Sequence, residues 1–345
     1  MDRWSPCLVE GSAGEIGLGH PLVDDYLELV RARARRNTLL AAAYDLKVFF
    51  GVVDKDPLDV KTADVYAFVK AQRQGPPASK VVRLVDGSAG LELSTIQRRL
   101  STVSGFYSFL VATERMDRSP VVRGAATRSS RDRRRRPSPM VRPVRLLPRI
   151  LEPVEVVALL GALRKWRDRA MFEAMVLGGL RRSEVLGLRF EDLRVGERRV
   201  FVADGKGGRQ RWVPMSPRFF ASVAAYLDAE RPVDDVDGEF VFVVLKGPHR
   251  GRVLTPKGLE EILRGARQRA GLGHATCHEL RHTCLTRLRE AGMALEAVQA
   301  QAGHRSIEST RVYLHLANDW LANEYRKASE AIDAQVMLDN EMSAS

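Results

Sequence analysis

Hydrophobic residues in the first third of the chain repeat at helical spacing. In TLLAAAYDLKVFF (38–50), apolar positions recur every three or four residues, and Thr38 is placed to cap the helix start. In LSTIQRRLSTVSGFYSFLVA (93–112), one apolar stripe again runs along the segment, and Ser94 and Gln97 have the spacing of a capping box. Both patterns predict amphipathic helices that pack together in a small helical domain.

The pattern changes twice after this domain. VVRGAATRSSRDRRRRPSPMVRPVRLLP (121–148) is rich in Arg, Ser and Pro and has almost no core-forming periodicity, which predicts a linker. Its arginine block suits a phosphate backbone, although a solvated, self-repelling hinge would have the same composition. The expected divisions are a flexible tail (1–20), a helical domain (21–118), a basic linker (119–148), a second domain (149–318) and a C-terminal helix and tail (319–345).

The second domain mixes helical and strand patterns. WRDRAMFEAMVL (166–177) is helical and is broken by two glycines. Two short alternating runs, 198–204 and 209–215, flank a Gly-Lys-Gly-Gly turn and predict a hairpin. Further helices are expected at about 257–271, 278–292, 294–302 and 319–337, the last with an apolar stripe at Leu321, Tyr325, Ala328, Ile332 and Val336.

The net charge of the chain says more about the class of its partner than the rest of its composition does. The 345 residues carry 55 Lys and Arg against 43 Asp and Glu, a formal charge of +12, which favours a polyanionic partner over an ordinary solvated surface. The three cysteines show no paired framework, and no apolar run approaches membrane-spanning length. We therefore expect a soluble protein of the cytoplasm with no membrane partner.

The stretch HELRH at 278–282 matches the short signature of a zinc peptidase. In that interpretation His278 and His282 would bind the metal and Glu279 would act as general base. Arg281, however, lies three residues after His278 and projects onto nearly the same helix face, where its permanent charge would compete with a dication. No third ligand is convincingly placed, so we expect no metal.

Five motifs of the second domain contain residues that could act together in one site. They are GGLRRSEVLGL, the hairpin turn DGKGGRQRWVP, HELRHTCLTRLREAG, QAGHRSIEST and TRVYLHL. Their chemistry-bearing residues are Arg181, Lys206, His278, Arg281, His304 and Tyr313. In this order and spacing they closely resemble the tyrosine recombinase (phage integrase) family, in particular its compact Xer-like and transposon-integrase members. The resemblance covers nearly the whole chain.

The resemblance implies a fold and an architecture. The fold would be mainly α with a small β-hairpin or sheet, giving an α+β catalytic domain. A helical core-binding (SAM-like) domain would precede it, and the two domains would form a C-shaped clamp around DNA.

The resemblance also implies a role for each matching residue. Tyr313 would be the nucleophile, and Lys206 on the hairpin would be the general acid for the leaving 5′-oxygen. Two arginines can hold the scissile phosphate at any pH without a metal ion or other cofactor. They would be Arg181 and Arg281, joined by His278 and His304 as phosphate ligands, with His278 also the candidate base. Glu184 and His282 would hold these groups in place without contacting the phosphate themselves.

The expected partner is double-stranded DNA with specific recombination sites, in a nucleoid-associated, cytoplasmic setting. A homotetramer would assemble on two sites through the C-terminal helix, unless that helix docks on its own domain. Accessory DNA-bending or directionality proteins are further candidate partners. The candidate DNA contacts are Lys47, Arg98, Arg99, Arg133, Arg134, Arg135, Arg136 and Lys257.

The leading interpretation is a site-specific recombinase that works through a 3′-phosphotyrosine intermediate. The alternatives are a topoisomerase-like or hairpin-forming enzyme with the same chemistry, and a DNA-binding protein without catalysis. The sequence leaves open whether the enzyme integrates a mobile element or resolves replicons, although the long basic linker favours a mobile element.

Overall fold

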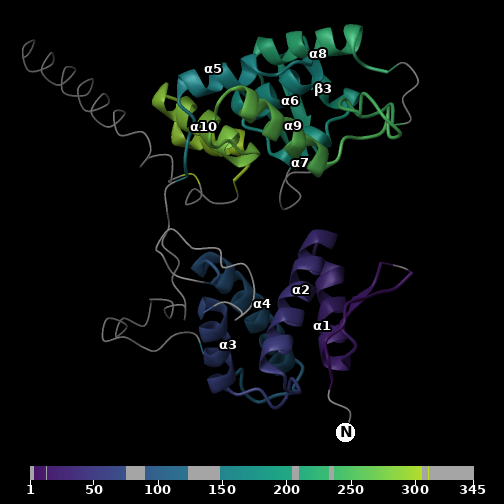
Figure 1. Ribbon diagram of the computed structural model, residues 1–345, viewed down its shortest axis with the longest axis vertical. Helices are drawn as coiled ribbons and strands as arrows, with labels where there is room; N and C mark the ends of the chain where they lie inside the picture. Colours follow the sequence, from purple (N-terminus) through teal and green to yellow (C-terminus); the bar gives the residue numbers. More distant parts are fainter. Residues whose placement is uncertain are drawn as a thin grey trace, which may run out of the picture. The chain divides into compact units, whose positions relative to one another are not determined.

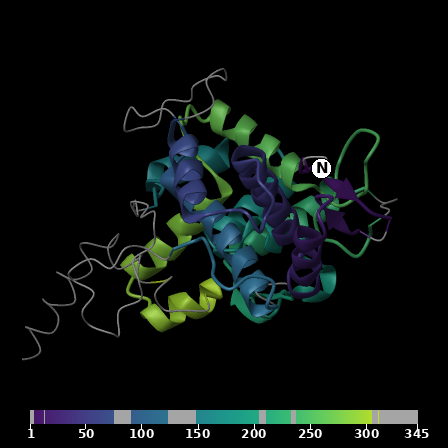
Figure 2. The same ribbon diagram turned by 90° about the horizontal axis from the view of Figure 1, so that it is seen from below.

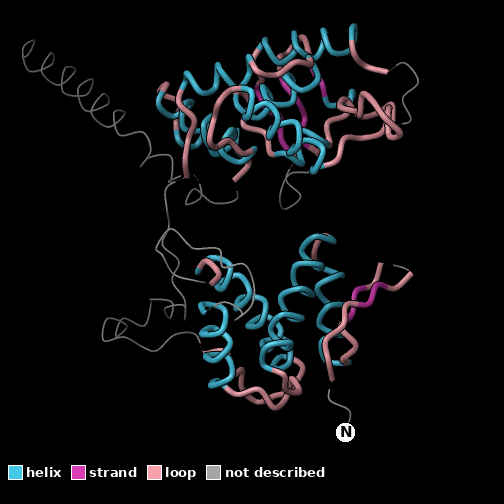
Figure 3. The backbone as a smooth tube through the Cα atoms, in the orientation of Figure 1, coloured by secondary structure: helices cyan, strands magenta, loops and turns pink. Residues whose placement is uncertain are grey.

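The computed structural model describes residues 4–12, 14–74, 90–122, 148–203, 210–232, 237–304 and 310. The chain divides into two compact units, Met1–Arg145 and Leu146–Ser345. Helices dominate both units, and the strands form small sheets (Figure 3). The expected fold, mainly α with a small β component, is confirmed. Within the described ranges, no helix is both long and apolar enough to cross a membrane.

The described residues of the first unit include four helices, and α2 runs beside α1 (Figures 1 and 2). Their apolar faces meet in an aromatic core, where Phe49 packs edge to face against Phe50, Phe68 and Tyr107. Phe50 packs in the same way against Phe106. The Tyr107 hydroxyl donates to the Pro57 carbonyl at 3.1 Å, so its polar end is satisfied inside the core. The helices are α1 (Pro21–Arg33), α2 (Arg36–Val53), α3 (Thr62–Gln74) and α4 (Leu93–Ala112).

The segment before α1 is part of this core, so the expectation of a flexible tail is wrong for its described residues. Strands β1 (Val9–Glu10) and β2 (Ile16–Gly17) pair as an antiparallel hairpin. Leu18 is fully buried, and the Trp4 indole donates to its carbonyl. Gly11 and Gly14 lie in the turn between the two strands, and the buried Ile16 and Leu18 anchor the segment to the core.

Two predicted helix caps are also wrong. Helix α2 begins at Arg36, because Arg35 is still extended, so Thr38 lies inside the helix. Helix α4 begins at Leu93 after an extended Glu92, so Ser94 is already helical and its hydroxyl donates to the Glu92 carboxylate. Neither helix start has a side-chain cap of its own.

The second unit is built around α6, which is buried along almost its whole length between α8 and α10. The predicted helices at 166–177, 257–271, 278–292 and 294–302 are confirmed to within a few residues. Its helices are α5 (Pro153–Gly161), α6 (Trp166–Val176), α7 (Arg182–Leu186), the 3-10 turn η2 (Phe190–Asp192), α8 (Pro217–Ala229), α9 (Pro256–Arg269), α10 (Cys277–Glu290) and α11 (Leu295–Ala302).

The predicted hairpin is confirmed as strands β4 (Arg199–Val202) and β5 (Arg211–Pro214), which pair antiparallel. A third strand, β3 (Leu193–Arg194), pairs with β4 on the other side. Its two residues are too few to show alternation, so the sequence pattern could not reveal it. The turn that joins β4 to β5 lies outside the described residues.

Removing the central ring of the first core should destabilise that unit. Phe49 is fully buried, so Phe49→Ala should lower the free energy of unfolding by about 3–5 kcal/mol through lost burial and a cavity. Tyr44→Ala, an exposed position on the same helix, should change it by less than about 0.5 kcal/mol. Native-state hydrogen exchange of the α2 and α4 amides measures both values, and equal effects would refute this view of the core.

Candidate active site

A glycine break sets the position of Arg181. Helix α6 ends at Val176, and Gly179 has a φ of +70°, a conformation that favours glycine. A Cβ on Gly179 would also lie only 3.3 Å from the Leu285 side chain of α10. The tight turn leaves Leu180 buried and places Arg181 at the N-cap of α7.

Helix α10 positions the residues of the HELRH stretch. Glu279 belongs to a capping box, in which its carboxylate accepts from the Thr276 backbone at 2.8 Å. That carboxylate also lies 2.7 Å from the His274 ring. The Nε2 atoms of His278 and His282 lie 2.8 Å apart, so one ring donates to the other. Glu279 thus serves the helix start, and the part of the chain that is described holds no cluster of three or more metal-ligating residues.

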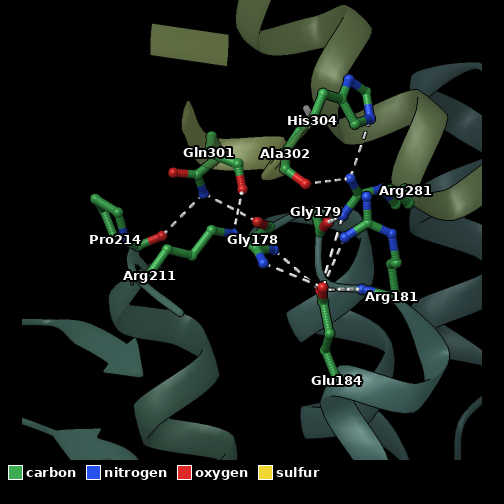
Figure 4. A network of polar contacts seen from close by, with 10 residues as sticks. All are labelled: Gly178, Gly179, Arg181, Glu184, Arg211, Pro214, Arg281, Gln301, Ala302 and His304. Carbon is green, nitrogen blue, oxygen red and sulfur yellow. Dashed lines mark hydrogen bonds and ion pairs between the residues drawn. The ribbon is translucent and has the colours of Figure 1, made fainter. Parts of the chain in front are cut away.

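A buried carboxylate, that of Glu184, connects three arginines (Figure 4). Arg181 Nη1 donates to it at 2.7 Å, and Arg211 binds both of its oxygens, at 3.1 and 3.0 Å. The closest nitrogen of Arg281 lies 3.8 Å away. Burial alone would raise the pKa of Glu184, but the hydrogen bonds and charge of Arg211, with those of Arg181, hold this pKa at about 2.

Arg281 is the most enclosed of the three cations, with 3% of its surface exposed. Its guanidinium donates to the Gly179 carbonyl and, at 2.6 Å, to the Ala302 carbonyl. It thereby fixes the glycine break and the end of α11 against α10. Arg181 retains 22% side-chain exposure and faces more open space.

His304 follows α11 and contacts Arg281. Arg281 Nη2 lies 3.3 Å from His304 Nε2, and His304 Nδ1 lies 3.0 Å from the Thr310 hydroxyl. Because an arginine can only donate, Nε2 accepts and the ring proton sits on Nδ1 when the ring is neutral. Burial and the charges of Arg281, Arg181 and Arg211 lower the pKa of His304 to about 4, so the ring is neutral at pH 7.

One open pocket of about 640 Å³ brings Arg181, His278 and Arg281 together. Its walls come from α7, α9 and α10 and carry three more arginines and a single acid. These additional charged residues are Arg182, Arg264, Arg267 and Glu260. The pocket therefore combines a positive surface with the volume to admit a phosphate diester and its neighbouring sugars.

The other candidates are either outside the described residues or not among the residues that line this pocket. Lys206, Tyr313 and the arginines at 133–136 lie outside the described residues. Lys257 is exposed in the first turn of α9. In the first unit, Arg98 binds the buried Asp45 and Arg99 binds Gln72, while Lys47 is half-buried.

Two residues of the network were missed from the sequence. Arg211 shares the inner face of β5 with the buried Val213, and a charged residue on such a face signals a buried partner. Gln301 is 6% exposed, and its amide donates to the Gly178 and Pro214 carbonyls. Its place on the buried stripe of α11 is a similar but weaker signal.

Comparisons with known proteins identify the family of the chain. Residues 149–319 match the model of the phage integrase family, and residues 23–114 match the phage integrase N-terminal SAM-like domain. The chain is 31% identical over 321 residues to tyrosine recombinase XerD of Caulobacter vibrioides, covering 88% of this chain and 95% of that protein. It is 29% identical over 300 residues to XerC of Halalkalibacterium halodurans, covering 84% and 90%.

Solved structures share the fold at low identity. A Tn1549 transposon integrase in complex with transposon right end DNA superposes with a TM-score of 0.66 at 18% identity, covering 88% of this chain and 98% of that one. The XerH site-specific recombinase bound to a palindromic difH substrate gives 0.64 at 19%, covering 87% and 82%. The chain belongs to the phage integrase family and is a tyrosine recombinase, an enzyme of site-specific recombination.

The site histidines predict a loss of stability in acid. Burial, with the charges of His278 and Arg281, lowers the pKa of His282 to about 4, which matches that of His304. An unfolded histidine titrates near about 6.5, so the unfolded chain binds more protons between the two values. The contribution to stability is complete above about pH 6.5 and is lost as the pH falls through about 4.

Urea unfolding at about pH 7 and about pH 5 tests this linkage. His304→Gln should lose less stability between the two conditions than the wild type, because one proton-binding site is gone. Equal losses would show that His304 does not resist protonation in the folded chain.

Proposed function

We propose that this recombinase cleaves and rejoins DNA at pairs of specific sites through a 3′-phosphotyrosine at Tyr313. One observation carries the proposal: Arg181, His278 and Arg281 line a single positive pocket, and His304 contacts Arg281 behind it. The four residues come from α7, α10 and the segment after α11, so only the folded chain brings them together.

The pocket suits a phosphate whose negative charge grows during the reaction. In the transition state of strand cleavage, charge develops on the non-bridging oxygens, and fixed cations near them lower the barrier. Arg181 and Arg281 supply charge at any pH, and their anchoring by Glu184 and by backbone carbonyls means that little reorganisation is needed. His278 lines the pocket beside them and is also the candidate base, whereas His304 acts through its contact with Arg281.

The covalent step is balanced without an external energy source. The Tyr313 oxygen attacks the scissile phosphorus and gives its proton to His278, the candidate base, while the bond to the 5′-oxygen breaks and that oxygen gains a proton, which Lys206 would deliver. The phosphotyrosine ester retains the energy of the broken bond. A 5′-hydroxyl from a second strand then attacks the ester and releases the tyrosine.

The assembly follows from this chemistry. Exchange between two duplexes needs four active subunits, so we propose a homotetramer on two sites, joined through the C-terminal helix at 319–345. The helical domain (21–118) and the catalytic domain (149–318) would close around the duplex as a clamp, with the arginine-rich linker along its phosphates. Accessory DNA-bending or directionality proteins, and a nucleoid-associated location in the cytoplasm, belong to the same proposal.

The long basic linker also favours a role in mobile-element integration over replicon resolution. The fold is about equally similar to a transposon integrase and to the XerH recombinase, and the identity with Xer recombinases supports the chemistry equally for both roles. The sequences that flank the gene would distinguish the two roles.

Tyr313→Phe should abolish the covalent protein–DNA adduct, because the nucleophilic oxygen is removed. The adduct is measured on a denaturing gel with a nicked duplex, selected by wild-type binding from a random-sequence pool. Tyr66→Phe, at an exposed tyrosine of α3, is the matched control and should keep the adduct. A wild type without adduct, or an adduct with Tyr313→Phe, would sink the proposed function.

The same selected duplex separates recombination from one-site chemistry. Exchange products should require two copies of the site on the substrate plasmid. Efficient relaxation of a plasmid with one site, without exchange between two, would favour the topoisomerase-like alternative.

Arg181→Ala should slow adduct formation about 100- to 1000-fold at saturating DNA, the usual effect of losing one oriented donor to a developing oxyanion. Arg269→Ala is the control, because this exposed arginine of α9 lies outside the pocket lining. Single-turnover rates measure both variants. Rates for Arg181→Ala within about threefold of the wild type would remove Arg181 from the mechanism.

A further inference from the structure

Arg211 occupies the centre of the polar network, although none of the expected catalytic roles involves it. Its side chain is 10% exposed, and its guanidinium binds both oxygens of Glu184. Its Nε donates to the Gln301 carbonyl at 3.2 Å. Figure 4 shows Arg211 on the opposite side of Glu184 from Arg181 and Arg281. Arg211 is also absent from the lining of the pocket.

The negative charge of Glu184 affects how strongly Arg181 and Arg281 can bind a phosphate. Arg181 and Arg281 can stabilise a phosphate only as far as their charge is not already neutralised. Glu184 lies beside both, at 2.7 and 3.8 Å, and its low pKa keeps it ionised. A carboxylate in that position would cancel one of the two charges, unless a further cation balances it. Arg211 supplies that cation through a two-pronged ion pair.

The surrounding backbone holds Arg211 in place. A Cβ on Gly303 would lie 2.8 Å from Arg211 Nη1, and Gly303 has a φ of +61°, so this position favours glycine on two grounds. The guanidinium is already fixed by Glu184 and cannot easily move away. Through these contacts Arg211 joins β5, the second strand of the hairpin, to α7 and to the turn before His304.

We propose that Arg211 is a positioning residue of the recombinase that neutralises Glu184, so that Glu184 aligns Arg181 while both pocket arginines keep their charge for the substrate phosphate. Glu184 holds Arg181 in position, and Arg211 balances the negative charge that Glu184 brings next to the two pocket arginines. This inference rests on the proposed function, because the positive charge of the two pocket arginines matters only if the pocket binds a scissile phosphate.

The proposal predicts an unusual relation between two substitutions. Arg211→Gln should slow adduct formation at least about tenfold at saturating DNA, since the uncompensated Glu184 then opposes the phosphate. Adding Glu184→Gln should restore at least about fivefold of that loss, because no unbalanced carboxylate remains. A role in packing alone predicts the reverse: the double variant would be as slow as Arg211→Gln or slower.

Two measurements keep this test independent of folding and of the proposed function. Circular dichroism and affinity for the selected duplex should be similar in all variants. The Arg167–Asp168 ion pair of α6 provides the matched control, because it is comparably buried and lies outside the network. Arg167→Gln, with and without Asp168→Asn, should leave the adduct rate per folded molecule within about threefold of the wild type.

The outcomes are separable. A wild type that forms no Tyr313-dependent adduct defeats the proposed function, whatever the Arg211 variants do. A normal wild type with Arg211→Gln within about threefold of it, or without rescue by Glu184→Gln, defeats the inference about Arg211 alone.

Discussion

The structure of the site depends on one buried acid, Glu184, which three arginines share. Each partner comes from a different part of the second unit: Arg181 from the start of α7, Arg211 from β5 and Arg281 from α10. Removing one partner from such a buried pair typically costs about 3–5 kcal/mol, because the remaining charge is left without compensation. The same interaction therefore stabilises the packing of three elements and fixes the direction of the cations.

The rest of the unit holds these elements at the required distances. The turn at Gly179 brings Arg181 back over α6, and its carbonyl accepts from Arg281. Gln301 ties α11 to the same glycine turn and to the end of β5. Helix α6 packs against α7 and α10, which carry Arg181 and Arg281, and is buried almost throughout, so small movements of these cations would disturb a packed core. Rigidity of this kind is what preorganised electrostatic catalysis requires.

The local features of this site can be predicted from the sequence better than its long-range contacts can. The glycine break before Arg181, the hairpin and the bounds of α10 follow from periodicity and turn residues, and the structure has all three. The caps assigned to Thr38 and Ser94 were misplaced, because the helix starts depend on how the preceding segment is packed. The role of Arg211 could not be found locally, since its partner Glu184 lies 27 positions earlier in the chain.

The central claim is that uncancelled positive charge at the pocket stabilises a negatively charged phosphate. Its most direct test compares Arg181→Ala with the wild type on two selected duplexes, one with a normal scissile phosphate and one with a neutral methylphosphonate in its place. On the phosphate, the rate of adduct formation should differ by about 100-fold or more, and on the neutral linkage the difference should shrink to less than about tenfold. An equally large difference on both substrates would contradict the account, because the arginine would then act by something other than its charge.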